Sequence, residues 1–218
     1  MSRLPSRHLL RDAALNAAAR GWHVFPIKPG GTEPAVQDWQ QKATSDPERI
    51  TRAWQYGPYN IGLMPCASRL LVVDLIPARL GERPPRRLQG PGVHDGADVL
   101  AALTEDAGVR FPTETFTVGT PQRGMALYFT HPQGPCPASS PGTDSRLGWH
   151  VAIRSTDCYV LLPGSTTADG AFTVMHDAPA ATWPDYLAAR LPARPPSSEC
   201  TTTSGEALLP EQESLPME

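Results

Sequence analysis

A single carboxylate inside an apolar run is the residue with the clearest potential for chemistry. Residues 70–76 read Leu-Leu-Val-Val-Asp-Leu-Ile, which predicts a buried strand with Asp74 near its end. A buried carboxylate costs several kcal/mol unless it is paired, protonated or bound to a metal. Metal-dependent phosphoryl-transfer enzymes often place a second carboxylate two residues further on, on the same strand face. That position holds Ile76, so the pair is only half present.

The elements around this strand predict an α+β domain, with helices concentrated in the first half of the chain. Helices are expected at residues 6–20, 45–56, 95–107 and 184–190. Strands are expected at residues 22–27, 60–64, 70–76, 114–120, 124–130, 149–154, 157–163 and 171–176. Ser45 and Glu48 have the spacing of a capping box, with Pro47 in the first turn.

Composition divides the chain into a folded domain at 1–190 and a tail at 191–218. Pro, Ser, Thr and Glu dominate the tail, which predicts disorder. The net charge is −3, but five acidic residues and no basic ones follow Arg194. The rest of the chain therefore carries 19 basic and 17 acidic residues, a balance that neither demands nor excludes a nucleic-acid partner.

The four cysteines and the hydropathy pattern bear on compartment. Cys66, Cys136, Cys158 and Cys200 form no Cys-x-x-Cys motif, so their spacing does not indicate structural zinc. No apolar run approaches the length of a membrane span, and no apolar leader pattern opens the sequence. We expect a cytoplasmic protein with reduced thiols and no membrane partner.

Short motifs follow one another in order between residues 8 and 190. They include Arg20-Gly-Trp-His-Val-Phe-Pro26, Asn60-Ile-Gly-Leu63, Leu71-Val-Val-Asp74, Thr115-Phe-Thr-Val-Gly-Thr-Pro121, Leu127-Tyr-Phe129 and Gly164-Ser165. On these residues the chain resembles the primase–polymerase domain of the archaeo-eukaryotic primase superfamily. This is the "bifunctional DNA primase/polymerase, N-terminal" type of bacterial, plasmid and phage replication proteins. The resemblance implies an RRM-like mixed sheet with flanking helices and a smaller α/β lobe.

The resemblance also implies a metal site, and here the chain departs from the family. In that family, strand-borne carboxylates hold Mg²⁺ or Mn²⁺ ions that bridge the phosphates of an incoming nucleotide. The first motif is Asp followed two residues later by Asp or Glu, and the chain has Asp74 and Ile76. The second motif is Gly-Gly-x-His, and the His position holds Ala126. The third is a carboxylate two residues before an Arg, and Ala152 stands there before Arg154.

Strand alternation predicts that these positions face the same way on three strands. We call the predicted set the motif floor: Asp74, Ile76, Ala126, Tyr128, Ala152 and Arg154. One carboxylate with waters and substrate phosphates would hold a divalent ion only weakly. Losing each electrostatic stabiliser typically costs about a hundredfold or more in rate. The sequence therefore predicts a catalytically degenerate domain in which Asp74 is a remnant.

The resemblance assigns nucleotide contacts to Arg154, Tyr128, Gly124 and Ser165, and simpler interpretations stand beside them. Asp74 and Arg154 could form a salt bridge across the old site. Tyr128 could pack in the core, and Ser165 could be a turn residue.

Two further polar residues lie near the third motif. His150 could replace a lost polar contact on the same face as Ala152, or be a surface residue. Asp157 could supply a displaced carboxylate from the adjacent turn.

We expect a degenerate primase–polymerase-family protein that keeps a groove for a nucleotide or single-stranded DNA. Two alternatives stay open: an active metal-dependent nucleotidyltransferase with displaced ligands, and a protein-interaction or regulatory module. The sequence has no Gly-x-x-x-x-Gly-Lys-Ser motif, so a helicase or other replication partner would be a separate chain.

Overall fold

A computed structural model of the protein describes residues 5–86, 92–131, 136–142 and 146–191. Its helical elements are α1 (Arg7–Ala19), α2 (Trp39–Lys42), α3 (Pro47–Trp54), η1 (Cys66–Ser68), α4 (Gly96–Asp106), η3 (Pro121–Arg123) and α5 (Asp185–Ala188). Its strands are β1 (Val24–Ile27), β2 (Asn60–Leu63), β3 (Leu70–Leu75), β4 (Thr117–Thr120), β5 (Gly124–Thr130), β6 (Val151–Arg154), β7 (Val160–Leu161), β8 (Thr166–Thr167), β9 (Gly170–Ala171), β10 (Thr173–His176) and β11 (Ala181–Thr182).

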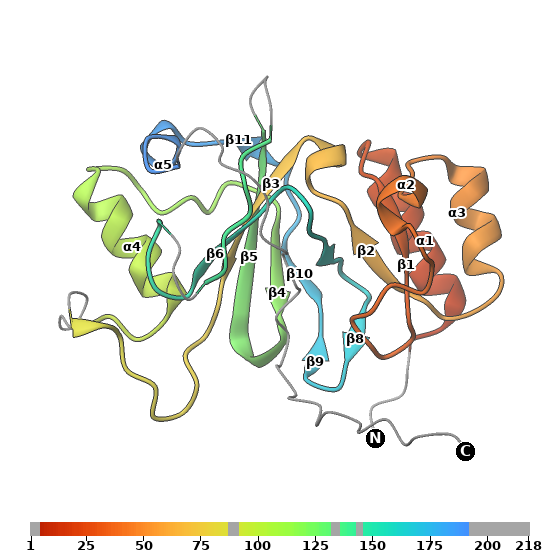
Figure 1. Ribbon diagram of the computed structural model, residues 1–218, viewed down its shortest axis with the longest axis horizontal. Coiled ribbons are helices and arrows are strands. Elements are labelled where there is room, and N and C mark those ends of the chain that lie inside the picture. The colour runs from red at the N-terminus through yellow and green to blue at the C-terminus, as the bar shows by residue number, and fades with distance from the viewer. Residues whose placement is uncertain (1–4, 87–91, 132–135, 143–145, 192–218) are drawn as a thin grey trace, which may run out of the picture.

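The smaller lobe combines a three-stranded sheet with the N-terminal helices. Its strand order is β1-β2-β7, and α1 and α3 pack beside it at one end of the long axis (Figure 1). Leu10 of α1 and Ile50 and Trp54 of α3 are buried in one cluster with Ile61 of β2. This spacing along α3 places both of its large apolar residues on one side of the helix, which explains why it packs there.

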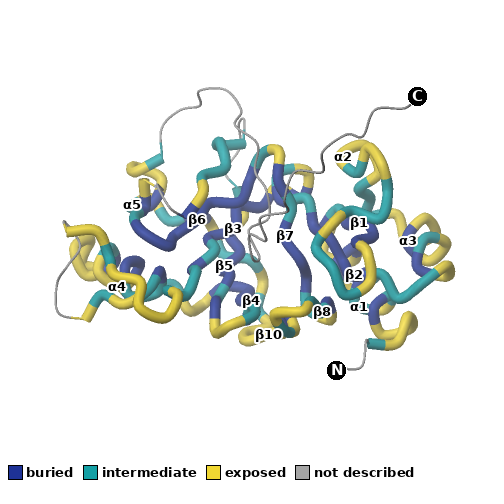
Figure 2. The backbone as a smooth tube through the Cα atoms, turned by 60° about the horizontal axis from the view of Figure 1, so that its bottom comes forward, coloured by how far each residue is buried: buried dark blue, intermediate teal, exposed yellow. Residues whose placement is uncertain are grey.

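The larger lobe is a six-stranded sheet that carries the motif floor. Its order is β10-β4-β5-β3-β6, with β11 added in parallel to β5. Leu71, Val73 and Leu75 of β3 face a cluster with α4 and α5, while Val72 faces the cluster that contains α1. Figure 2 shows the strands β3, β5 and β6 mostly buried, with more exposed helices on either side and the edge strand β10 exposed. Because both faces of β3 are covered by protein, its residues are apolar on both faces and do not alternate with polar residues.

The α+β class with two lobes is confirmed, and most expected elements lie within three residues of the observed ones. One local detail was wrong. The N-cap of α3 is Asp46, whose Oδ1 accepts hydrogen bonds from the backbone N–H groups of Glu48 and Arg49. Asp46 lies next to Pro47, so its carboxylate takes the position that the capping-box pattern gave to Ser45. The predicted tail from residue 192 lies outside the described residues.

The expectation of reduced thiols was also wrong for two cysteines. Cys66 and Cys136 form a disulfide, whereas Cys158 is a buried thiol that belongs to no disulfide. The two paired cysteines are 70 residues apart. They meet because Leu70, near the first, pairs with Thr130, near the second, across β3 and β5. The spacing of the cysteines in the sequence does not indicate that β3 and β5 pair.

None of the described helices is both long and apolar enough to cross a membrane.

Asn60 connects three segments of the smaller lobe. Its side chain is almost fully buried, and its Nδ2 donates to the carbonyl oxygens of Gly31 (2.9 Å) and Thr166 (2.7 Å). Its Oδ1 accepts from the Thr166 N–H at 3.0 Å. One side chain thereby holds the 28–34 loop and β8 against β2.

Replacing Asn60 by alanine should lower the free energy of unfolding by about 2–4 kcal/mol, because buried backbone groups lose their partners. Urea denaturation measures this value. Asn16→Ala, the same change on the exposed side of α1, should stay within about 0.5 kcal/mol of wild type. Equal effects of the two variants would contradict the role given to Asn60.

Candidate functional site

The register of three strands brings the motif residues together on one sheet face. Asp74 lies directly opposite Ala126 of β5 on one side and Ala152 of β6 on the other. Val72, two residues earlier, lies between Tyr128 and Arg154 in the same way. Directly opposed Cβ atoms are about 4.5–5.5 Å apart. A carboxylate at 152 and an imidazole at 126 would therefore be next to Asp74, but the chain places methyl groups there.

Ile76 lies just beyond the end of β3. Its N–H donates to the carbonyl of His150 (2.8 Å), and its carbonyl accepts from the N–H of Gly96 at the start of α4 (3.1 Å). Its half-buried side chain packs against Gly142, where an added Cβ would lie only 2.6 Å from Ile76 Cδ1. The position of the missing second carboxylate is thus filled by apolar packing.

Asp74 is paired with Arg154. An Nη2–Oδ2 distance of 3.2 Å joins them, and their side chains are 21% and 4% exposed respectively. Arg154 is diagonal to Asp74 across β3 and β6, a separation that a long guanidinium side chain can bridge. The salt bridge that the sequence offered as the simpler interpretation is present. Ala126, Asp74 and Ala152 form a row across β5, β3 and β6. The salt bridge balances the only carboxylate of this row with a buried cation.

Tyr128 approaches Asp74 from the opposite strand but belongs to the core. Its ring is fully buried, stacks on Trp22 at 5.6 Å and meets Phe116 edge-on at 5.3 Å. Burial first, and then the negative charge of Asp74, raise the pKa of the Tyr128 phenol, so the hydroxyl stays protonated at neutral pH. That hydroxyl has no hydrogen-bond partner among the described residues. Stacking on a base would require this ring to leave Trp22.

Gly124 and Ser165 are held by contacts within the fold. A side chain on Gly124 would collide with Thr120 Oγ1, so a larger residue at the start of β5 would have to displace the Thr120 side chain. Ser165 is completely buried, and its Oγ accepts a hydrogen bond from the Ile61 N–H at 2.9 Å. A nucleotide contact by either residue stays a prediction.

His150 is buried, which corrects the surface interpretation. Its Nε2 lies 2.9 Å from Oε1 of Glu82, which the 77–86 segment carries to the start of β6. Burial raises the pKa of Glu82, but hydrogen bonds from the Arg79 N–H and His150 outweigh it and lower that pKa overall. The sequence gave no signal for Glu82, because a proline-rich stretch without periodicity does not reveal its neighbours.

The donor set does not fit a two-metal centre. Among the residues that the structure describes, no group of three or more His, Cys, Asp or Glu side chains could hold a metal ion. Asp157 lies in the exposed turn after β6, with a left-handed φ of 54°. Asp74 remains the one carboxylate in its row, and Arg154 already engages it. Weak Mg²⁺ or Mn²⁺ binding at Asp74 stays a prediction.

The Asp74–Arg154 pair should show strong energetic coupling in a double-mutant cycle. Asp74→Asn and Arg154→Met should each destabilise the protein by about 2–3 kcal/mol, because each leaves a partly buried group uncompensated. The double variant should cost at least about 1 kcal/mol less than the two single costs combined. Chemical denaturation of the four proteins measures the coupling.

The exposed pair Lys28–Glu33 provides a matched control. Its side chains are 60% and 73% exposed. A cycle with Lys28→Met and Glu33→Gln should give no measurable coupling, because solvent screens an exposed ion pair. Additive costs for Asp74 and Arg154 would show that their contact contributes nothing to stability.

Comparison with known families agrees with this geometry. The family described as bifunctional DNA primase/polymerase, N-terminal, matches residues 14–186, a span that includes β3, β5, β6 and the Ser165 loop. No curated protein sequence matches the chain. The family match covers well over half of the chain and lies inside the domain expected at 1–190. The chain therefore belongs to the family of bifunctional DNA primase/polymerase N-terminal domains.

Proposed function

We propose that this protein is a catalytically degenerate member of its family that binds a nucleotide or single-stranded nucleic acid without transferring nucleotides. The observation that carries the proposal is the row Ala126–Asp74–Ala152, in which one paired carboxylate lies between two methyl groups. In-line phosphoryl transfer on two metals needs several carboxylates to hold the ions. This row offers one, and Arg154 competes with any ion for it.

Alanine at positions 126 and 152 in place of charged residues also changes which ligand the site would bind. Several acidic side chains repel phosphates unless metal ions neutralise them, whereas a single carboxylate paired with a guanidinium carries no net charge. Phosphates could then approach Asp74 and Arg154 without a bridging ion. Asp74 is one-fifth exposed, so the pair remains accessible at that residue.

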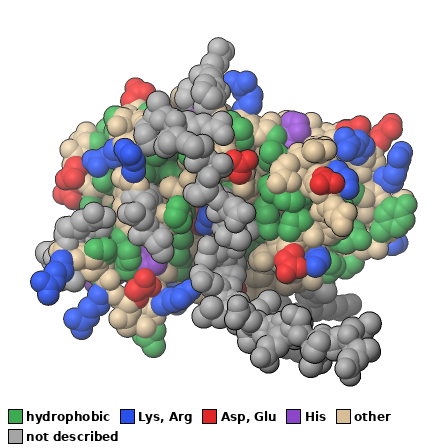
Figure 3. All heavy atoms as spheres, viewed as in Figure 1, with side chains coloured by type: hydrophobic (Ala, Val, Ile, Leu, Met, Phe, Trp, Pro, Cys, Tyr) green, Lys and Arg blue, Asp and Glu red, His purple; other side chains and the backbone are tan. Residues whose placement is uncertain are grey.

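The distribution of surface charge favours a single nucleotide over a long nucleic acid. On the coloured part of the face in Figure 3, Lys and Arg side chains are interspersed with Asp and Glu and form no continuous stripe. Contacts with many phosphates dominate nucleic-acid affinity, and a continuous basic surface normally supplies them. One nucleotide needs fewer such contacts.

A primer-extension assay tests the loss of catalysis. Purified wild-type protein with Mg²⁺ or Mn²⁺ should incorporate nucleotides no faster than Asp74→Ala, because the remaining ligands cannot position two ions. Metal-dependent incorporation by wild type that Asp74→Ala abolishes would refute the proposal. The triple variant Ile76→Asp, Ala126→His, Ala152→Asp restores the family pattern, and where it folds it should exceed wild type by at least about a hundredfold.

Isothermal titration with a nucleoside triphosphate tests binding separately. Wild type should bind with the same affinity, within about threefold, in Mg²⁺ and in EDTA, since no bridging ion is needed. Asp74→Asn should bind at least as tightly, because a repulsive charge is removed. Asp185→Asn, the same change on exposed α5, should leave the affinity unchanged. Absence of binding heat would refute the nucleotide site and favour a protein-interaction role.

A further inference from the structure

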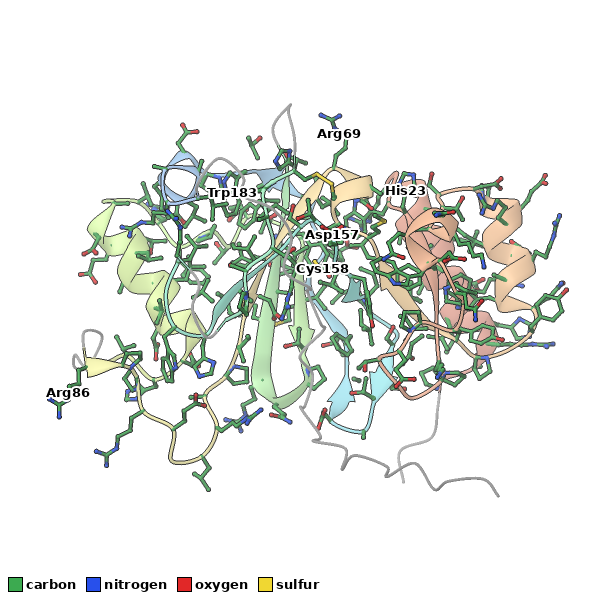
Figure 4. The ribbon with its side chains drawn as sticks, viewed as in Figure 1. His23, Arg69, Arg86, Asp157, Cys158 and Trp183 are labelled. Carbon is green, nitrogen blue, oxygen red and sulfur yellow. A yellow bond between two sulfur atoms is a disulfide. The ribbon has the colours of Figure 1, made fainter. Side chains whose placement is uncertain are left out.

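The disulfide Cys66–Cys136 anchors one end of a segment that we call the strap, residues 136–142. Cys66 belongs to η1, directly before β3, and both cysteines are only half-buried. Figure 4 shows the sulfur–sulfur bond at the end of the sheet, close to the labelled Arg69. A small thiol reagent could therefore reach this bond from solvent.

The strap lies along the outer edge of β6. Backbone hydrogen bonds join Ser140 and Ile153 in both directions, at 2.9 and 3.1 Å, and the Ser139 Oγ accepts from the Ser155 N–H at 2.9 Å. At the far end, the carbonyl of Gly142 accepts from the His150 N–H at 2.7 Å. The other edge of β6 pairs with β3. The strap thus covers the open edge of the strand that carries Arg154.

Apart from the contact of Gly142 with Ile76, few apolar contacts hold the strap in place. Residues 136–140 are half-buried, Pro141 is exposed and Gly142 is buried, and no strap residue belongs to either hydrophobic cluster. The hydroxyls of Ser140 and Ser155 are buried without a hydrogen-bond partner among the described residues. Segments with few buried apolar contacts open locally at low free energy. The covalent bond to Cys66 is therefore the strongest attachment of the strap.

The thiol of Cys158 lies beneath the strap, so its reactivity depends on where the strap is. Its thiol is buried, and its Sγ lies 3.2 Å from the Oγ of Ser139 in the strap. A strap that leaves β6 removes this cover and opens a path to the thiol. The protein therefore contains a cysteine whose reactivity measures whether the strap is in place.

We propose that Cys66–Cys136 is a reversible redox site that locks the strap onto β6, and that its reduction releases the strap. A dithiol supplies two electrons and two protons: the Cys66–Cys136 bond breaks, an S–H bond forms on each cysteine, and the dithiol closes to a cyclic disulfide. Release would uncover the edge of β6 and the thiol of Cys158. The inference is independent of nucleotide binding.

Hydrogen exchange followed by mass spectrometry tests the release. Treatment of the full chain with a dithiol should accelerate exchange about tenfold or more in peptides covering 136–142 and 150–156. Peptides from β1 and β2, which share no hydrogen bond with the strap, should be unchanged. Alkylation of Cys158 should accelerate in parallel, and reoxidation by a small-molecule disulfide should reverse both effects.

The double variant Cys66→Ser, Cys136→Ser is the matched control. It should behave like reduced wild type, and the dithiol should have no further effect on it. Equal exchange in oxidised and reduced wild type would overturn the proposal, as would four free thiols in the oxidised, denatured protein. Should the double variant fail to fold, the comparison of oxidised with reduced wild type still decides.

Discussion

The position of β3 between two antiparallel neighbours is the constraint on which the site depends. Hydrogen-bonded pairing with β5 on one edge and β6 on the other fixes which residues lie opposite Asp74. A shift of one residue would turn every side chain of the strand to the other face. The register therefore decides three things together: the methyl groups beside Asp74, the reach of Arg154, and the burial of Tyr128 against Trp22.

Within this register, the charge of Asp74 belongs to a salt bridge with Arg154. A carboxylate in an apolar sheet must be compensated, and Arg154 compensates Asp74 from the adjacent strand. The neighbouring residues Ala126, Ala152 and Ile76 carry no charge, so burying them has no such desolvation cost. Apolar packing and backbone hydrogen bonds between β3, β5 and β6 hold this part of the sheet together.

The two edge strands of the larger sheet, β6 and β10, are protected from pairing with other chains in different ways. The strap covers β6, whereas β10 is exposed along its length and carries an irregularity between Val174 and His176. Irregular edge strands pair poorly with other chains, which protects the sheet without a cover. At the β6 edge the protection comes from a segment tethered by a disulfide, so that edge depends on the redox state of two cysteines.

The sequence by itself determined the elements and the shared face of the motif floor, because helix periodicity, strand alternation and turn residues are local properties. It also identified positions 76, 126 and 152, where Ile and Ala stand in place of the charged residues that the family pattern predicts. Only the tertiary structure decided which groups meet. It selected the salt bridge for Asp74, placed Tyr128 in the core, joined Glu82 to His150 and paired Cys66 with Cys136. These contacts join residues far apart in the chain, and their proximity follows from how sheets and loops pack, which no local pattern encodes.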